Sequence, residues 1–529
     1  MREPRGTFDF IVVGAGPAGC ATATRLATLK PEASVLLVET GPVKSGLRSD
    51  VPLGIATLVP YRNARNYSYR TVPQTGLNGR RGVQPRGRGL GGSSLINAMI
   101  YIRGQHEDYD DWARAGATGW SWRDVFPWFL RSEDNARGAD AWHATGGPLA
   151  VGDLASPSDC ARAFVDAAAQ CGHAINPDFN GASQEGVGTY QVFQRQGQRW
   201  NAARAYLTAL AQKNLTVLAE TPVARVLIEG SRATGIACTN GDRYIARAEV
   251  VLAAGAFGTP QLLMLSGIGP SAHLRELGIA VQHDAPGVGA DLQDHVDFVI
   301  SRAVDDRGLF GTVPSIVPQV LRAITPFRRG HGLLTSNVAE AGGFLRTRPD
   351  LDRPDVQLHL CIGIVDNHSR RLHATRGLSL HTCVLRPHSR GSMRLAGTDA
   401  RKAPLIDPAF LTDARDMDTL LAGTALARRI LAAPAFARYA GPALYDAETD
   451  DESRLREIVR AHADTIYHPV GTCRMGNDAD AVVDPELRVR GIAGLRVADA
   501  SIMPTLISGN TQAACAMIGE RAAEFIAHG

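Results

Sequence analysis

The sequence predicts an α/β fold with two parts, one built on a parallel sheet and the other an α+β part with an antiparallel sheet and helices. Three observations support this prediction. At the N-terminus a short apolar strand, a glycine-rich turn, a helix and a second strand follow one another. Between residues 300 and 410, short apolar runs alternate with polar residues, which is typical of antiparallel strands. With 529 residues, the chain is also too long for one simple core.

The first elements follow directly from local patterns. Residues 8–13 predict a buried strand because the run is short, β-branched and flanked by turn signals. Residues 17–29 predict a helix whose small side chains face the sheet, and residues 34–39 predict the second strand. Residues 42–86 are rich in Pro, Arg, Asn and Tyr and are interpreted as extended covering segments. Residues 86–103 form a second glycine-dense turn, which we expect to run into a helix.

The remaining elements are predicted from periodicity and composition. In chain order they are helices within residues 105–150, an amphipathic helix over 160–172, a polar loop region over 176–200, two strands within 214–228, a buried strand at 248–254, an antiparallel sheet within 300–410, helices within 413–462, a short strand at 495–499 and a terminal helix over 511–527. No internal repeat interrupts this order.

Composition excludes several functional classes. Hydrophobic residues make up 44% and charged residues 21% of the chain, as in ordinary globular proteins, and the net charge of +3 gives no sign of a nucleic-acid partner. No apolar run of about 18 residues predicts a transmembrane helix, and the N-terminus lacks the pattern of a signal peptide. The eight cysteines are scattered without zinc spacing, which favours reduced thiols, no metal site and a cytoplasmic location. Peripheral contact with the inner membrane stays open.

The N-terminal turn has the spacing of a dinucleotide-binding fingerprint. Gly14, Gly16 and Gly19 lie between a strand and a helix, as in a Rossmann-like βαβ unit. The first glycine permits the tight turn, the second lets the backbone approach a pyrophosphate, and the third allows close packing of helix and strand. Pro17 and Ala18 open the helix, whose N-terminus favours an anion.

The second strand ends in an acidic residue. Glu39, followed by Thr40, suits hydrogen bonds to the two ribose hydroxyls of a dinucleotide. The alternative to a dinucleotide site is a glycine turn that binds no ligand. The strand before the turn, the helix after it and the acidic residue at the end of the second strand argue against this alternative. The fingerprint alone does not separate NAD from FAD.

A candidate base and its partner lie near the C-terminus. His468 follows Tyr467 and precedes a Pro-Val-Gly-Thr turn, and Asn510 comes 42 residues later, at the start of a predicted helix. The pKa of a free histidine lies near about 6.5, which suits proton transfer at working pH. Of the 15 histidines, His106, His295, His359 and His381 are interpreted as structural, and His295 is assigned no chemistry.

Four long motifs in order resemble the glucose-methanol-choline family of oxidoreductases, whose members bind FAD. They are GRGLGGSSLINAMIY, the run from Gly255 to Gly269, HPVGTCRMG, and VADASIMPTLISGNTQAA. The resemblance extends from Phe8 to the end of the chain, and it is greatest for the bacterial branch that includes sorbose, polyethylene glycol and aliphatic alcohol dehydrogenases.

The resemblance implies a set of FAD contacts. Beside the isoalloxazine ring it places Gly91, Gly92, Asn97, Ala98 and Met99; at the adenine and pyrophosphate, Val223, Ala254 and Gly255; and along the rest of the cofactor, Asp499, Ala500, Thr511 and Gln512, with Tyr467 in the pocket wall. Some family members attach FAD through a histidine where this chain has Ile96, so we expect non-covalent FAD. An FAD-binding domain is expected from residues 1–150, 205–300 and 465–529, and a substrate domain from 151–204 and 301–464.

The resemblance implies oxidation of a small alcohol to an aldehyde or ketone. A hydride moves to flavin N5, His468 takes the hydroxyl proton, and Asn510 orients the substrate oxygen. The terminal helix, which begins near Thr511, favours negative charge on the reduced flavin. The electron acceptor is a quinone or oxygen. The alternatives are a hydroxynitrile lyase that keeps FAD, an NAD-dependent dehydrogenase and a noncatalytic flavoprotein.

Overall fold

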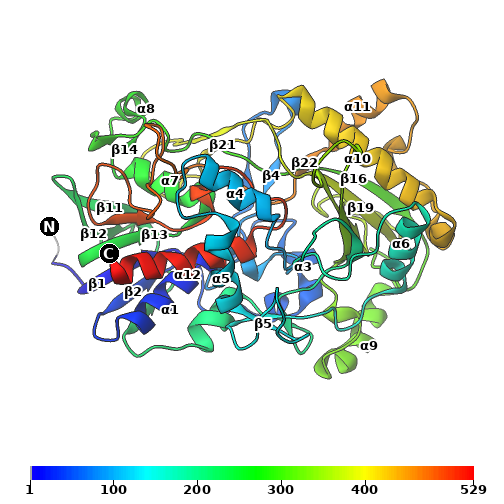
Figure 1. The fold of residues 1–529 in the computed structure, drawn as a ribbon, viewed down its shortest axis with the longest axis horizontal. Coiled ribbons are helices and arrows are strands. Elements are labelled where there is room, and N and C mark those ends of the chain that lie inside the picture. Colours follow the sequence, from blue (N-terminus) through cyan, green and yellow to red (C-terminus); the bar gives the residue numbers. More distant parts are fainter. Residues whose placement is uncertain (1–2) are drawn as a thin grey trace.

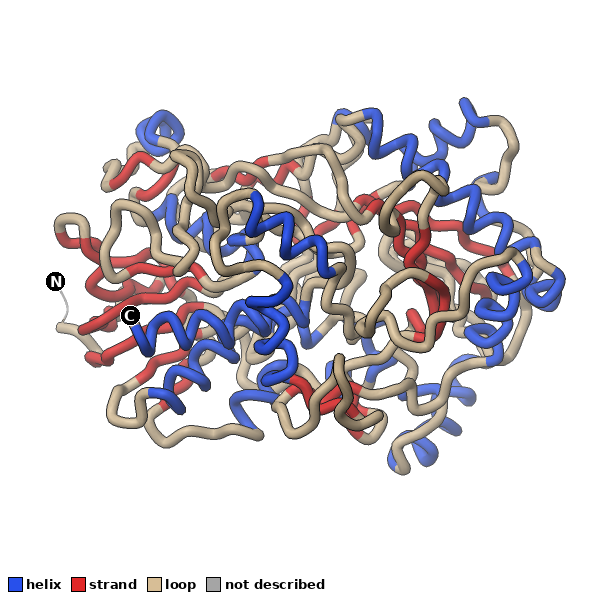
Figure 2. Tube along the Cα trace, in the orientation of Figure 1, coloured by secondary structure: helices blue, strands red, loops and turns tan. Residues whose placement is uncertain are grey.

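Two large β-sheets at opposite ends of the molecule organise the fold (Figure 1; Figure 2). The structure is a computed structural model that describes residues 3–529. The first sheet has seven strands, which are β1 (Gly6–Val13), β2 (Val35–Val38), β10 (Leu215–Leu218), β11 (Val223–Glu229), β12 (Arg232–Cys238), β13 (Arg243–Leu252) and β23 (Leu495–Val497). Strands β10, β2, β1, β13 and β23 run parallel, whereas β11, β12 and β13 form an antiparallel meander. The predicted parallel sheet is therefore confirmed.

The second sheet has six strands and is antiparallel throughout, as the sequence predicts. In order across the sheet they are β22 (Asp464–Thr465), β16 (Val296–Ala303), β19 (Gly377–Val384), β18 (Val356–Cys361), β17 (Ala339–Leu345) and β7 (Gly186–Thr189). Helices α6 (Asp159–Gln170), α10 (Ala414–Ala432) and α11 (Glu452–His462) pack against it. Strand β16 spans residue 300, one of the predicted domain boundaries, and the division into domains stays a prediction.

The other elements lie outside the two large sheets. The helices are α2 (Leu47–Asp50), α3 (Ile55–Leu58), α4 (His106–Arg114), α5 (Trp122–Ser132), α7 (Gly255–Leu265), α8 (Ser271–Glu276) and α9 (Ile316–Arg328). The strands, all in two-stranded pairs, are β3 (Tyr69–Arg70), β4 (Val83–Gln84), β5 (Glu133–Asn135), β6 (Leu149–Val151), β8 (Gln194–Arg195), β9 (Gln198–Arg199), β14 (Ile268–Gly269), β15 (His283–Asp284), β20 (Ser392–Arg394) and β21 (Leu405–Asp407). In the described part of the chain, no helix combines the length and hydropathy needed to cross a bilayer.

Five expectations about these elements are wrong. Residues 42–86, interpreted as extended segments, contain the short helices α2 and α3, and residues 176–200, interpreted as a loop region, supply β7 to the large antiparallel sheet. Residues 86–103 do not run into an α-helix, because Gly91, Gly92 and Met99 have positive φ angles that an α-helix excludes, and only a single 3₁₀ turn forms at Gly92–Leu95. The region 300–410 contains a helix, α9, whose apolar residues recur every three or four positions. The run that includes β20 pairs with β21 outside the large antiparallel sheet.

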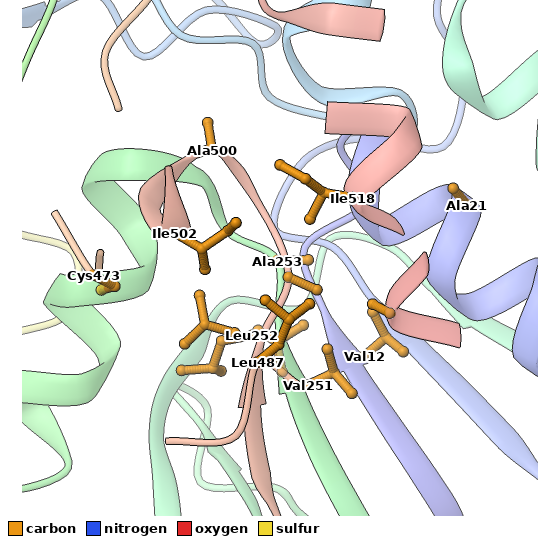
Figure 3. Packing of buried hydrophobic residues seen from close by; sticks show 14 of the residues in the cluster. Val12, Ala21, Val251, Leu252, Ala253, Cys473, Leu487, Ala500, Ile502 and Ile518 are labelled. Carbon is orange, nitrogen blue, oxygen red and sulfur yellow. The ribbon is translucent and has the colours of Figure 1, made fainter. Parts of the chain in front are cut away.

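The N-terminal and C-terminal helices pack together on the first sheet. Helix α1 (Pro17–Leu29) contacts α12 (Gln512–His528) over much of its length. Val12, Leu252 and Ile518 are fully buried in the core beneath the two helices (Figure 3). Because α1 follows the glycine turn and α12 follows Asn510, this contact fixes the two ends of the chain relative to each other.

A substitution at Gly519 tests this helix contact. A Cβ atom there would lie 2.3 Å from the Ala18 carbonyl oxygen and 2.8 Å from the Ala21 Cβ. Gly519→Val is therefore expected to lower the free energy of unfolding by about 1–3 kcal/mol or more through overpacking, as measured by denaturant titration. Ala527→Val, in the partly exposed last turn of α12, serves as the control, and an equally stable Gly519→Val protein would contradict the packing described.

Candidate active site

One cavity of about 910 Å³ joins the carboxyl ends of β1 and β2 to strands β18 and β19 of the second sheet. Ligands in open parallel sheets bind at such carboxyl ends. The predicted site residues that line the cavity are Gly14, Gly16, Pro17, Ala18, Glu39, Thr40, Gly92, Asn97, Ala98, Met99, Val223, Ala254, Gly255, Tyr467, His468, Asp499, Ala500, Asn510, Thr511 and Gln512. Gly19 and Gly91 lie behind this wall. The glycine turn and His468, which are far apart in sequence, thus share one cavity.

The glycines of the N-terminal turn have different environments. Gly14 has a φ of +103°, and a Cβ on it would lie 2.5 Å from the Ala253 carbonyl oxygen. A Cβ on Gly19 would lie 1.8 Å from the Gly14 carbonyl oxygen, so helix and strand pack too closely for any side chain there. A Cβ on Gly16 would meet nothing within 4 Å. The backbone at Gly16 is therefore open to the cavity.

The second glycine turn packs directly on the first. Gly91 N–H donates to the Ala15 carbonyl at 2.8 Å. A Cβ on Gly92 would lie 2.6 Å from the Gly16 Cα. The role of Gly91 is thus to hold this turn against the fingerprint, while Gly92 lies on the cavity surface.

Glu39 is held by the backbone. Its Oε1 accepts from the N–H groups of Gly41 and Gly89 at 2.8 and 3.0 Å, and its Oε2 accepts from Ala15 N–H at 3.0 Å. A carboxylate offers about four lone-pair positions, so about one remains free. The Glu39 carboxylate can therefore accept one further hydrogen bond, whereas the sequence predicted that it binds two ribose hydroxyls.

Three helix N-termini open onto the cavity. The residues that precede α1, α7 and α12 are Gly16, Ala254 and Thr511, and all three line it. Asp499 Oδ2 accepts from Gly255 N–H at 2.8 Å and so fixes the start of α7. The free N–H groups and dipoles of these helices favour a ligand that carries negative charge.

The loop that carries His468 is firmly anchored. His468 N–H donates to Asp294 Oδ1 at 2.8 Å, and the Arg86 guanidinium donates to the Tyr467 carbonyl at 2.5 Å. Tyr467 has a φ of +79°, an unfavourable conformation that anchored surroundings stabilise. Burial raises the pKa of Asp294 to about 6. The anchors direct the imidazole of His468 into the cavity.

A chain of hydrogen bonds fixes the tautomer of His468. Nε2 of His295 lies 3.0 Å from the Leu385 carbonyl oxygen, which only accepts, so this nitrogen carries the hydrogen. Nδ1 of neutral His295 is then an acceptor. It lies 3.0 Å from Nδ1 of His468, which must therefore donate. Nε2 of His468 is left with the lone pair.

Asn510 faces that lone pair with its amino group. Its Oδ1 accepts from Gln357 Nε2 at 3.1 Å, which fixes the amide orientation. Its Nδ2 lies 3.2 Å from Nε2 of His468 and donates to it. The two residues predicted as catalytic are thus in direct contact, with the lone pair of one beside the N–H of the other.

Burial keeps these imidazoles neutral. Burial lowers the pKa of His468 well below its usual value, and His295 and His359 lower it further. Burial also lowers the pKa of His295 to about 4 and that of His359 to about 3. Neutral rings are required by the hydrogen-bond chain, so the charge state and the tautomer agree.

Sequence reasoning missed three histidines at this site. His106 is stacked between Trp122 and Trp142, as a structural residue would be. In contrast, His359 and His381 line the cavity, and His295 contacts the candidate base. His295 was assigned no chemical role from the sequence, and the contact of His295 with the candidate base does not support that assignment. The only signal in the sequence was its place at the end of GVGADLQDH.

Residues 8–297 and 387–519 match two family models, both described as GMC oxidoreductase. The chain belongs to the GMC oxidoreductase family. An alcohol dehydrogenase (acceptor) of Pseudomonas putida is 44% identical, over 98% of this chain and 95% of the relative. An oxygen-dependent choline dehydrogenase of Sinorhizobium fredii is 38% identical, also over 98% and 95%. The solved structure of pyridoxine 4-oxidase from Mesorbium loti has a TM-score of 0.87 at 32% identity, over 98% of each chain.

The cavity fits the cofactor of this family, which is FAD-dependent. The open backbone at Gly16 and the three helix N-termini suit a pyrophosphate and an electron-rich ring. The free lone pair of Glu39 suits one ribose hydroxyl. Membership of the family makes the chain an oxidoreductase that acts on CH–OH donors.

Proposed function

We propose that this protein oxidises a small alcohol to an aldehyde or ketone with bound FAD, and that His468 is the general base. The observation that supports this proposal best is the position of the His468 lone pair. It points into the cavity whose other end has the dinucleotide fingerprint. The alcohol dehydrogenase of Pseudomonas putida, at 44% identity, agrees with this reaction.

The chain's own groups bind and deprotonate the alcohol. When bound, FAD supplies the acceptor for the hydride that leaves the alcohol carbon. Nε2 of His468 takes the hydroxyl proton, because the neutral ring has its lone pair there. The amino group of Asn510, held in place by Gln357, donates to the substrate oxygen and orients it. The N-terminus of α12 stabilises negative charge beside it.

The cofactor is held without a covalent bond in this proposal. Ile96, which is buried and lines the cavity, has no nucleophilic atom. The predicted site residues bind FAD through backbone and polar contacts, with Val223 beside the adenine. We also propose that the protein works in the cytoplasm or peripherally at the inner membrane and that a quinone or oxygen reoxidises it.

Anaerobic reduction of the FAD-loaded protein tests this function. A panel of primary and secondary alcohols is mixed with the protein, and the flavin absorbance near about 450 nm is followed. We expect at least one alcohol to bleach the flavin and to yield the matching carbonyl compound. Reoxidation by air or by a soluble quinone then identifies the acceptor. An FAD-loaded protein that cleaves hydroxynitriles but is bleached by no alcohol would overturn the proposal.

The contact between His295 and His468 gives a separate prediction. His295→Leu removes the acceptor that fixes the His468 tautomer, so the rate of flavin reduction is expected to fall about 10–100-fold, as for other supporting contacts. FAD content and rate are measured beside His528→Leu, an exposed control. An unchanged rate would show that His295 only fills space.

A further inference from the structure

Three buried histidines besides His468 line the cavity, and they are His359, His368 and His381. His368 is held by the Tyr467 hydroxyl at 2.7 Å and by Asp464 at 3.1 Å, so the other two remain to be explained. His359 and His381 face each other across β18 and β19, with ring centroids 6.5 Å apart. Both line the cavity, and their exposed fractions are 3% and 6%.

Within residues 3–529, no well-formed hydrogen bond reaches either nitrogen of His359 or Nε2 of His381. The nearest polar side chains are Asn510 beside His359 and Cys361 beside His381. Buried polar atoms without partners are uncommon, and such atoms call for a ligand or water.

The direction of the His381 donor follows from its other nitrogen. Nδ1 of His381 lies 2.6 Å from Oδ2 of Asp297. Asp297 lines only a smaller neighbouring cavity of about 280 Å³, whereas His381 lines both cavities. Nε2 lies on the opposite side of the ring, and it therefore faces the main cavity beside Cys361, which lines that cavity alone.

The two histidines differ in pKa. Burial opposes the charge on His381, but Asp297 and Cys361 raise its pKa well above the usual value. Burial also raises the pKa of Asp297, and because Nδ1 of His381 faces this carboxyl group, Nε2 is the donor toward the main cavity. Burial lowers the pKa of His359 to about 3, so this ring is neutral and offers one donor and one acceptor. His359 is close enough to His468 and to His381 for the charges of these rings to affect one another.

This end of the cavity offers no free negative charge. Among residues 3–529, the only acidic residues in the cavity wall are Glu39 and Asp499, and backbone N–H groups hold both at the nucleotide end. The wall near the histidines includes the apolar residues Val338, Ala339 and Val365, and its polar members, Asn337, His368, Ser369 and Tyr467, include no acid. A cationic ligand would therefore lose its hydration without gaining a counter-charge.

We propose that His359 and His381 form a substrate subsite for a second oxygen atom, so that the preferred substrate is an uncharged alcohol with an additional hydroxyl or ether oxygen. This inference rests on the proposed function. His381 donates to the second oxygen, and His359, which is neutral, donates to or accepts from one of the two oxygens. Cationic alcohols such as choline are excluded, although a choline dehydrogenase is among the relatives.

Binding without turnover tests the subsite. The FAD-loaded protein is titrated with diols of increasing length whose hydroxyls are tertiary, and with the matching tertiary mono-alcohols. Tertiary alcohols have no hydride to give, so the change in flavin absorbance reports binding alone. At one chain length we expect the diol to bind about tenfold more tightly than its mono-alcohol, which is the effect of one well-placed hydrogen bond. Choline is expected to bind more weakly than either.

Variants assign the preference to His381. His381→Leu is expected to abolish the tenfold ratio, and His381→Gln, whose amide still donates, to retain part of it. Asp297→Asn keeps the size of the side chain but removes the carboxyl group, and it is expected to reduce the ratio. His528→Leu, far along α12 and exposed, is expected to keep the wild-type ratio.

The outcomes separate the subsite from the proposed function. Equal binding of diols and mono-alcohols by the wild-type protein, tight binding of choline, or an unchanged ratio in His381→Leu would each overturn the subsite. Primary and secondary alcohols of the same lengths are tested in parallel for flavin reduction. If none of them reduces the flavin, the proposed function fails, and the binding ratio still decides whether the two histidines hold an oxygen.

Discussion

Replacing His468 with alanine is expected to lower the rate of flavin reduction by alcohol about 10²–10⁴-fold, the usual contribution of a positioned base. The FAD content is expected to stay at the wild-type level, because the glycine turns that form the nucleotide end of the cavity do not include His468. Anaerobic stopped-flow reduction measures the rate, and the flavin absorbance of the purified protein measures the content. A fully loaded His468→Ala protein with the wild-type rate would falsify the assignment.

The pH dependence of the wild-type protein checks the same residue. A base works only when deprotonated, and burial, His295 and His359 lower the pKa of His468 well below its usual value. kcat/KM for flavin reduction is therefore expected to stay level from about pH 8 to about pH 6.5 and to fall only in more acidic solution. Added imidazole is expected to restore part of the rate in His468→Ala. A wild-type acidic limb centred near about 6.5 would show that the base is not this buried ring.

The parts of the structure that the sequence predicts best depend on local patterns. Helix α1 begins and ends at the predicted residues, Pro17 and Leu29, because the glycine turn and the small residues define it within one short segment. His468 and Asn510 stand out because each adjoins a turn or a helix start. The structure brings them within 3.2 Å of each other. Their roles in the reaction stay a proposal.

The histidines of the second sheet were beyond sequence reasoning. Apolar and polar residues alternate along β18 and β19, which separates the face of His359 and His381 from the leucine face. Because every residue of both strands is buried, this alternation does not show that the polar face lines a cavity. His359 and His381 face each other only because β18 and β19 pair in this register. His295 meets His468, 173 residues further along the chain, because β16 begins beside β22. Such contacts come from tertiary pairing and leave no local signal.

The helix that was expected within residues 86–103 shows a second limit of prediction from sequence. The glycines of this segment were correctly interpreted as a turn. The positive φ of Met99 could not be predicted, because a methionine side chain does not favour that conformation. The turn is held instead by contacts with distant residues. Gly91 binds the Ala15 carbonyl, and Arg199 donates to the Asn97 carbonyl at 2.7 Å. These contacts override the local helix propensity.

Replacing Gly16 with valine is expected to give a folded protein that binds FAD much more weakly. A Cβ at this position meets nothing within 4 Å, and the φ of −73° is allowed for any residue, so folding is not affected. The side chain would instead occupy the space through which a pyrophosphate approaches the start of α1. Overpacking of the valine side chain against the bound pyrophosphate is expected to cost about 1–3 kcal/mol of binding free energy. This cost corresponds to an increase of about 5- to 150-fold in the Kd of FAD. Titration of the FAD-free protein and its melting temperature measure the two effects separately.

Gly16 is the one fingerprint position at which cofactor binding separates from folding. A side chain on Gly14 or Gly19 would collide with backbone oxygens at 2.5 and 1.8 Å, so loss of FAD in those variants would follow from misfolding alone. Gly16→Ala is expected to give a smaller loss of affinity than Gly16→Val. Gly363→Ala, whose Cβ would make ordinary contacts at 3.6 Å or more, is the matched control. If Gly16→Val melts as the wild type does and still purifies with a full complement of FAD, the pyrophosphate does not lie on this turn.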